Sequence, residues 1–100
     1  MPKGYWVASY HSIKDPAALK KYAEAAGPVL TSFGARFLAR GMPAKVYEDG
    51  ANERCVVAEF ESVDRAIAAY ESQAYQAAFA LLKDACVREV RIVPGVGEPT

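Results

Sequence analysis

Two arginines in one short segment, Arg36 and Arg40, are the side chains of this sequence best suited to hold an anion. The segment is predicted to be a β-strand, and residues an even number of positions apart on a strand share one face of the sheet. A guanidinium group binds a carboxylate or a phosphate through two parallel hydrogen bonds. Capture of a compact anionic ligand is therefore one interpretation of this pair. The other is structural ion pairing with Glu59 and Glu89, because a buried guanidinium group must be paired.

Two candidates for acid–base chemistry accompany the arginines. Glu59 lies in the middle of an apolar strand segment, where a carboxylate that faces a cavity can hold or transfer a proton. His11 is the only histidine of the chain, and an imidazole group titrates in the physiological range. Glu59 and His11 are thus the predicted catalytic residues. Each also fits a structural role, Glu59 as the counter-ion of Arg36 and His11 as a residue at a pocket rim.

The other predicted ligand contacts come from side chains near these residues. Tyr5 and Ser9 alternate with His11 along the first predicted strand and share its face. Tyr70 lies near the junction of two predicted helices, where it would rim the mouth of a cavity. No metal is expected, because one histidine cannot form a zinc site and the cysteines are not spaced as zinc ligands. No cofactor is expected either.

Composition limits the class of protein. The chain has 100 residues, 52% hydrophobic and 24% charged, which is typical of one globular domain. Its 12 basic and 12 acidic residues cancel, which disfavours nucleic-acid binding and polybasic membrane binding. No apolar run approaches the ~20 residues of a membrane helix, and the first residues lack a signal-peptide pattern. Two cysteines, Cys55 and Cys86, are too few for a disulfide scaffold, so free thiols and a cytoplasmic location are expected.

Four segments rich in aromatic and β-branched residues are predicted strands: 4–12, 35–40, 54–60 and 87–93. Between the second and third of them, residues 44–48 are expected to form a short or irregular strand. A turn with hairpin chemistry is expected over residues 49–52.

Three helices are predicted between the strands. Asp15 and Pro16 provide an N-cap and a proline for the first turn of a helix that ends at Gly34. Gly27 and Pro28 interrupt its pattern, so a kink or a restart is expected there. Serines are predicted to cap the two later helices, at Ser62 and Ser72.

The order strand, helix, strand, strand, helix, strand predicts an α+β, ferredoxin-like βαββαβ fold, with a four-stranded antiparallel sheet and helices on one face. The domain is expected over residues 1–94, with a C-terminal tail over 95–100. Strand alternation divides the sheet into a helix face and an open face. The helix face is predicted to hold Trp6, Ala8, Tyr10, Phe37, Ala39, Val56, Ala58, Phe60, Val90 and Ile92. The open face is predicted to hold Tyr5, Val7, Ser9, His11, Arg36, Leu38, Arg40, Cys55, Val57, Glu59, Glu89, Arg91 and Val93.

The open face mixes apolar and charged side chains. Its apolar part, which includes Tyr5, Val7, Leu38, Cys55 and Val57, is large for a surface left in water. Either the face is solvated, or two sheets pack face to face in a homodimer with the charged groups around a cavity.

Several segments carry a family resemblance: Gly4-Tyr5-Trp6, residues 34–41, residues 59–62 and residues 70–76. They resemble the DUF-1330 family of uncharacterised bacterial proteins, over about residues 4–93. Glu61 stands where the family pattern has a proline. The resemblance implies a dimeric α/β barrel, in which two ferredoxin-like subunits pack sheet to sheet. That superfamily includes cofactor-independent monooxygenases, muconolactone isomerase-like enzymes and haem-binding chlorite dismutases, but a shared fold implies no particular reaction.

The expected partner of this chain is therefore a second copy of itself, with a small anionic ligand between the two sheets. In one hypothesis the protein is a cofactor-independent enzyme, monooxygenase- or isomerase-like. Arg36 and Arg40 would hold the anion, with Tyr5, Ser9 and Tyr70 around it, and Glu59 or His11 would move a proton. In the other, the same pocket belongs to a non-catalytic small-molecule-binding or stress-associated dimer. The sequence does not separate the two.

Overall fold

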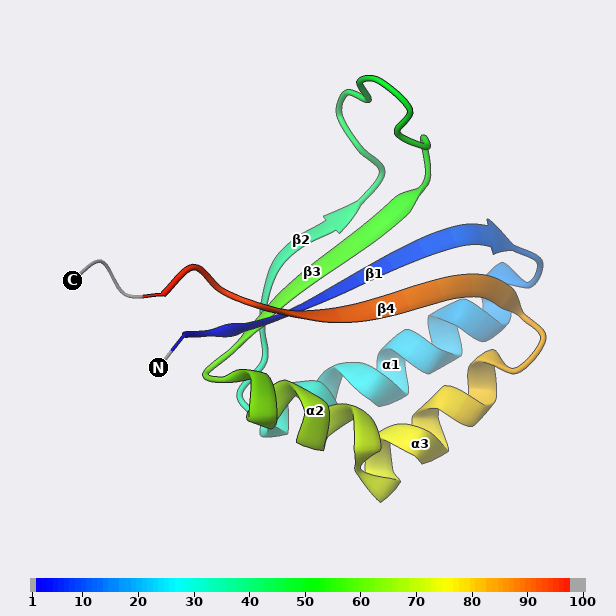
Figure 1. The fold of residues 1–100 in the computed structure, drawn as a ribbon. Helices are drawn as coiled ribbons and strands as arrows, with labels where there is room; N and C mark the ends of the chain where they lie inside the picture. Colours follow the sequence, from blue (N-terminus) through cyan, green and yellow to red (C-terminus); the bar gives the residue numbers. More distant parts are fainter. Residues whose placement is uncertain (1, 98–100) are drawn as a thin grey trace.

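The computed structural model describes residues 2–97, and within them the strands form one sheet in the order β2-β3-β1-β4. In chain order the elements are β1 (Gly4–Ile13), α1 (Pro16–Ser32), β2 (Arg36–Gly41), β3 (Arg54–Phe60), α2 (Val63–Glu71), α3 (Gln73–Phe79), a 3₁₀ turn (Ala80–Leu82) and β4 (Cys86–Pro94). All neighbouring strands are antiparallel, and the helices lie on one side of the sheet (Figure 1). The predicted ferredoxin-like fold is confirmed.

The three helix starts form as the capping residues predict. The carboxylate of Asp15 accepts a hydrogen bond from the Ala18 N–H at 3.1 Å, with Pro16 in the first turn of α1. The hydroxyl groups of Ser62 and Ser72 accept corresponding bonds at the starts of α2 and α3. Each cap satisfies a backbone N–H that has no partner inside its helix.

A kink or a restart was expected at Gly27 and Pro28. Helix α1 does not restart there but continues to Ser32. Proline removes a single backbone donor from the helix. The buried side chains of Ala26 and Leu30, on either side of it, anchor both halves of α1 against the sheet. The helix ends as predicted, with Gly34 in the left-handed region at φ 91°.

The strand expected at residues 44–48 is absent, because beyond the last β2–β3 pair, Gly41 with Cys55, this segment has no strand beside it. The turn in this connection begins earlier than the predicted residues 49–52, because the N–H of Gly50 donates to the carbonyl of Tyr47 at 3.1 Å. The connection between β2 and β3 projects beyond the sheet in Figure 1.

A β-bulge in β2 changes which face its side chains occupy. Phe37 pairs with Ala58 on the helix face, but the next pair along is Ala39 with Val57, because Leu38 is an extra residue. Alternation is therefore reversed beyond Leu38. Ala39 therefore lies on the open face, and Arg40, which pairs with Val56, lies on the helix face. The prediction that Arg36 and Arg40 share a face is wrong for this reason.

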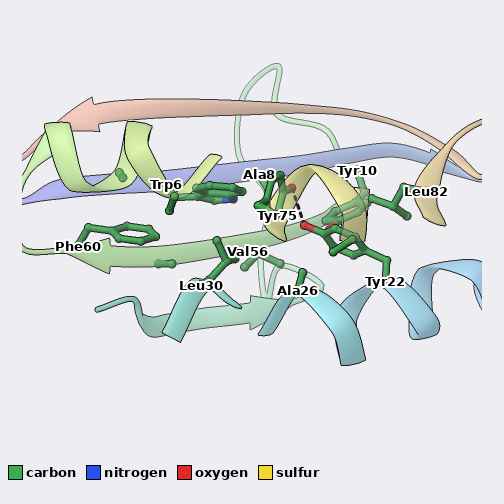
Figure 2. Close-up of a cluster of buried hydrophobic side chains, with 14 of the residues drawn as sticks. Trp6, Ala8, Tyr10, Tyr22, Ala26, Leu30, Val56, Phe60, Tyr75 and Leu82 are labelled. Atoms are coloured by element: carbon green, nitrogen blue, oxygen red, sulfur yellow. Dashed lines mark hydrogen bonds between the residues drawn. The ribbon is translucent and has the colours of Figure 1, made fainter. Parts of the chain in front are cut away.

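The core lies between the helix face and the helices (Figure 2). Its largest fully buried side chains are Trp6, Phe60 and Tyr75. Gly4 lies in close contact with the start of α2, where a Cβ atom would stand 2.5 Å from the Ser62 carbonyl oxygen. Small residues at such contacts let the helices approach the sheet closely.

The predicted tail over 95–100 falls partly outside the described residues, which end at 97. In its described part, the N–H of Gly95 donates to the carbonyl of Lys3 at 2.7 Å.

Candidate anion-binding site

The polar side chains of the open face interact mainly with one another. The hydroxyl of Tyr5 donates to Glu59 Oε2 at 3.1 Å. This hydrogen bond to a carboxylate raises the pKa of Tyr5, so the phenol keeps its proton. Arg36 pairs with Glu59 in the strand register, but within residues 2–97 no ion pair joins Glu59 to Arg36 or Arg40. Glu59 thus has a phenol as its partner.

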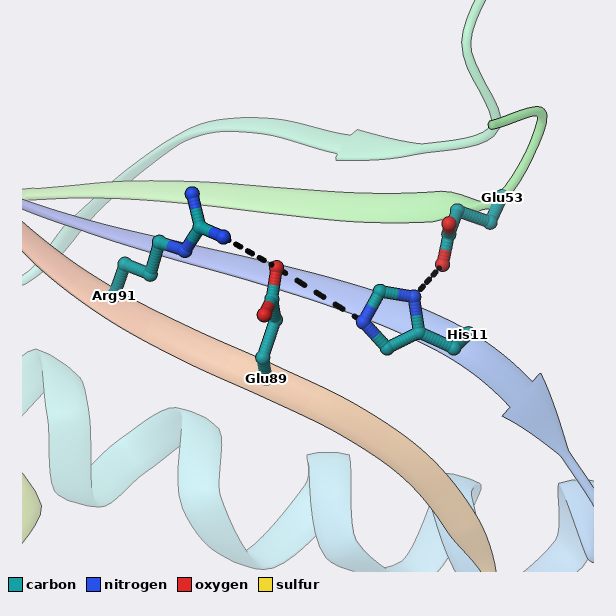
Figure 3. Close-up of polar contacts among 4 residues, drawn as sticks. All are labelled: His11, Glu53, Glu89 and Arg91. Carbon is teal, nitrogen blue, oxygen red and sulfur yellow. Dashed lines mark ion pairs between the residues drawn. The ribbon is translucent and has the colours of Figure 1, made fainter. Parts of the chain in front are cut away.

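His11 stands between two carboxylates at one end of the open face (Figure 3). Its Nδ1 lies 2.6 Å from Glu53 Oε2, and its Nε2 lies 3.9 Å from Glu89 Oε1. Arg91 Nη2 lies 3.3 Å from the same Glu89 oxygen. The imidazole side chain is 43% exposed, so this cluster is a solvated charge network, of a kind that contributes little to stability.

The predicted site residues therefore divide between the two sides of the sheet. Five of them occupy the open face: Tyr5, Ser9, His11, Arg36 and Glu59. The other two, Arg40 and Tyr70, lie on the helix side. In α2, the ring of Tyr70 packs against Trp6 and Tyr75, with ring centroids 5.6 and 5.1 Å apart. Tyr70 is thus part of the core side of the subunit and does not rim a space in front of the open face.

Arginines gather instead around a cavity of about 60 Å³ between α1 and the helix face. It is lined by Trp6, Ala8, Tyr10, Leu19, Tyr22, Ala23, Ala26, Gly27, Leu30, Phe37, Arg40, Arg54, Val56 and Arg88. Three of these side chains carry a positive charge, and no aspartate or glutamate lines the cavity. A cationic, otherwise apolar and aromatic cavity is the arrangement that binds a small organic anion.

Arg88 is the centre of a hydroxyl network. Its Nη1 donates to Tyr10 at 3.3 Å and to Tyr22 at 3.2 Å, and its Nη2 donates to Tyr75 at 2.5 Å. The hydroxyl groups of Tyr22 and Tyr75 also bond to each other at 2.7 Å (Figure 2). The guanidinium carbon lies 5.4 Å from the ring centre of Phe79. Arg88 is therefore held by phenols, with no carboxylate of residues 2–97 paired to it.

Tyr10, Tyr75 and Arg88 keep their protons at neutral pH. Burial raises the pKa of Tyr10 and of Tyr75, so both keep their protons. Burial by itself would lower the pKa of Arg88, but the oxygens of Tyr22, Tyr75 and Tyr10 together outweigh it, and the pKa of Arg88 is raised. A site that offers N–H and O–H groups next to fixed positive charge selects ligands rich in acceptor oxygens.

Arg54 and Arg40 complete the charged wall. Arg54, Tyr10 and Arg88 are register partners across three strands, and the ring of Tyr10 lies 6.0 Å from the Arg54 guanidinium carbon and 5.6 Å from that of Arg88. On β2, the Arg40 guanidinium carbon lies 5.1 Å from the ring centre of Phe37. Aromatic faces thus orient all three guanidinium groups beside the cavity.

Arg88 and Arg54 were not among the site residues predicted from sequence. The signal for both was present, because alternation places Arg88 on the same face as Val90 and Ile92, and Arg54 on the same face as Val56. A charged residue at a helix-facing position of a strand departs from the apolar pattern there. Such a departure indicates a functional group more often than a residue on the solvated face does.

A second cavity, of about 360 Å³, adjoins the other side of Arg88 beneath α2. Its walls are mostly apolar and come from Ile67, Tyr70, Phe79, Val90 and Ile92, with Glu71 as its acidic residue. Glu71 offsets the charge of Arg88 in this lining, whereas the cavity under α1 has three arginines and no acidic side chain.

The chain offers few other chemical features. Over residues 2–97, no three His, Cys, Asp or Glu side chains are grouped as metal ligands would be. None of the helices described is long and apolar enough to span a membrane.

Cys55 and Cys86 are both free thiols, as expected from the sequence. Burial raises the pKa of Cys86, and the neighbouring Arg88 offsets only part of this effect. The thiolate is the reactive species, so a raised pKa leaves less of it at pH ~8. We expect iodoacetamide to modify Cys86 more slowly in the native protein than in urea, with the difference shrinking as pH rises through the raised pKa. Mass spectrometry of non-reduced protein should find both cysteines alkylated, and a disulfide between them would contradict this.

The family comparison gives a match over most of the chain. A family model described as a domain of unknown function, DUF1330, matches residues 3–96. This match confirms the resemblance seen in the sequence. No curated protein is significantly similar to the chain in sequence.

Solved structures share the fold at low sequence identity. A protein of unknown function from Rhodopseudomonas palustris is 14% identical with a TM-score of 0.71, over 97% of this chain and 85% of that one. SnoaB, a cofactor-independent oxygenase from Streptomyces nogalater, is 12% identical with a TM-score of 0.66, over 100% and 97%. A dimeric protein of unknown function with a ferredoxin-like fold from Bacteroides fragilis is 10% identical with a TM-score of 0.61, over 92% and 95%. These similarities establish the fold alone.

Proposed function

The chain belongs to the DUF1330 family, a domain of unknown function, and from that premise we propose that it is a homodimer whose subunits each bind a compact organic anion under α1. One observation carries the proposal: three guanidinium groups line one cavity to which no carboxylate side chain contributes. Uncompensated charge of one sign beside a low-dielectric cavity concentrates ligands of the opposite sign. Arg40, Arg54 and Arg88 are the residues that would hold the anion.

The proposed site keeps the anionic ligand expected from the sequence but moves it from the open face to the helix face. Arg40 remains a ligand-binding residue in this proposal, because the bulge in β2 carries it to the cavity. Glu59 and His11 stand on the opposite face of the sheet. They would therefore belong to the surface on which two subunits meet, and they would not exchange protons with a ligand under α1.

The dimer half of the proposal rests on the open face. Apolar side chains run across its middle, among them Val7 and Val57, which are register partners on the two central strands. Near its margins, Leu38 is 47% exposed and Val93 is 44% exposed. An apolar surface of this extent marks an interaction site, and the Bacteroides fragilis relative with the same fold is dimeric. Burying one such face against its copy gives a closed two-fold dimer.

A second candidate function, turnover of the bound anion without a cofactor, is favoured by Tyr10. Its oxygen accepts a hydrogen bond from Arg88, so its own proton is left to point elsewhere, and no acceptor for it is present within residues 2–97. A phenol polarised by a cation can donate to a ligand oxygen as negative charge develops there. SnoaB, with the same fold, is an oxygenase that works without a cofactor.

Ligand binding can be followed directly, because Trp6 is the only tryptophan and lines the cavity. A panel of small organic anions is screened by thermal shift, and hits are titrated by tryptophan fluorescence. We expect Arg40→Ala to weaken binding of a hit by about tenfold or more, since a charge-assisted hydrogen bond contributes roughly 1.5–3 kcal/mol. Arg40→Lys should also bind more weakly, because the planar fork is lost.

The matched control is Arg91→Gln, which removes an arginine from the open face and should leave the affinity unchanged. Equal affinities for Arg40→Ala and the wild type would refute the site. Recovering the hit after incubation separates the two functions: an unchanged compound indicates a binding protein, and a converted one indicates an enzyme.

A further inference from the structure

We propose that the ligand under α1 is a compact dianion, a small dicarboxylate or a phosphate monoester, and that a monoanion of the same shape binds much more weakly. This inference rests on the proposed function and specifies its ligand class. It follows from the number of charges at the cavity, from their unused donors and from the space between them.

The charge count comes first. Arg40, Arg54 and Arg88 line the cavity, and none of them forms an ion pair with a carboxylate of residues 2–97. A monoanion would leave two of the three guanidinium groups that line the cavity without compensation. Like charges in a partly desolvated site repel more strongly than in water. A second negative charge on the ligand removes most of that repulsion.

The donors show where the two charges would be bound. Three of the five N–H groups of Arg88 already donate to Tyr10, Tyr22 and Tyr75. Arg40 and Arg54 make no hydrogen bond to an acceptor within residues 2–97, so both retain a full set of N–H groups. They stand on neighbouring strands of the same face and only two residues apart in register, since Val56 pairs with Arg40. Two free planar forks suit two carboxylates, or one phosphate with three oxygens.

The space is small for a ligand with a large apolar part. A cavity of about 60 Å³, at roughly 10–15 Å³ for each water-sized group, admits about four to six heavy atoms. A dicarboxylate or phosphate monoester of that size consists largely of its acidic groups. The remaining wall, formed by Ala23, Ala26, Gly27 and Leu30 of α1, offers apolar contact to a short carbon linker.

The test compares probes that differ by one charge and share a shape. Methyl phosphate is titrated against methyl sulfate, and oxalate against its monoamide oxamate, at pH ~8, where the second acid group of the phosphate, with a pKa near 6, is ionised. Tryptophan fluorescence of Trp6 reports binding to the full chain. We expect each dianion to bind at least about tenfold more tightly than its monoanionic partner, a factor that corresponds to about 1.4 kcal/mol. The stronger of the two dianions tells whether the source is a phosphate or a dicarboxylate.

Substitutions of Arg40 and Arg54 test whether these two arginines bind the second negative charge of the ligand. Arg40→Gln and Arg54→Gln should each reduce the preference for the dianion to about threefold or less. The matched control is Arg65→Gln, because Arg65 also stacks on a phenylalanine, with its guanidinium carbon 5.3 Å from Phe33, but does not line the cavity. Equal affinity for dianion and monoanion would overturn this inference and leave the anion site standing. Failure of all four probes and of the wider anion panel would overturn the site and this inference together.

Discussion

Replacing Tyr75 with Phe is expected to lower the free energy of unfolding by about 1–3 kcal/mol, the usual cost of leaving buried polar groups without a partner. The ring of Tyr75 is fully buried, so Phe fills nearly the same volume and no cavity opens. Only the hydroxyl is lost, and with it the acceptor for Arg88 and the partner of Tyr22. Urea unfolding followed by circular dichroism measures the change.

The matched control for this variant is Tyr47→Phe. Tyr47 is 72% exposed in the β2–β3 connection, so removal of its hydroxyl should change stability by less than about 0.5 kcal/mol. If Tyr75→Phe is as stable as the wild type, then the network around Arg88 is not the structural support of the cavity that its geometry indicates. The same pair of variants should separate in ligand binding, because only Tyr75 positions an arginine of the site.

Replacing Val57 with Asp is expected to convert the proposed dimer into monomers or insoluble protein. Val57 lies on β3 in the centre of the open face, opposite Val7. In a two-fold dimer each subunit would bring one carboxylate into the apolar seam, and an unpaired buried charge costs several kcal/mol, roughly. Light scattering at micromolar concentration measures the mass of the particle in solution. Leu38→Asp, at the edge of the same face, is the milder companion variant if Val57→Asp does not fold.

The control for the dimer prediction is Leu81→Asp. Leu81 is 44% exposed in the 3₁₀ turn on the helix side, so its substitution should leave the mass unchanged. A monomeric wild type would remove the dimer from the proposed function. It would not affect the cavity under α1, because that cavity lies on the helix side of the sheet, away from the open face.

Signals that act over a few residues determined most of the fold. Asp15, Ser62 and Ser72 satisfy backbone donors three residues further along, and the helices begin where these caps predict. Strand alternation placed the core correctly at Trp6 and Phe60. The order of elements then leaves the ferredoxin-like arrangement as the way to bury one side of the sheet.

The candidate site depended on contacts that only the folded chain makes. Alternation in the sequence places Arg40 on the open face, but the pairing of β2 with β3 accommodates Leu38 as an extra residue and reverses that placement. A bulge is decided by the partner strand, so the local pattern of β2 cannot reveal it. Arg88 acquires its environment in the same way. Its partners Tyr10 and Tyr22 are 78 and 66 positions away, and they meet it because β1 pairs with β4 beneath α1. The sequence by itself determined the helices, the four strands of the sheet and the faces of β1, β3 and β4. Tertiary packing decided the faces at the end of β2 and which arginines surround a cavity, since these depend on strand register and on distant hydroxyl groups.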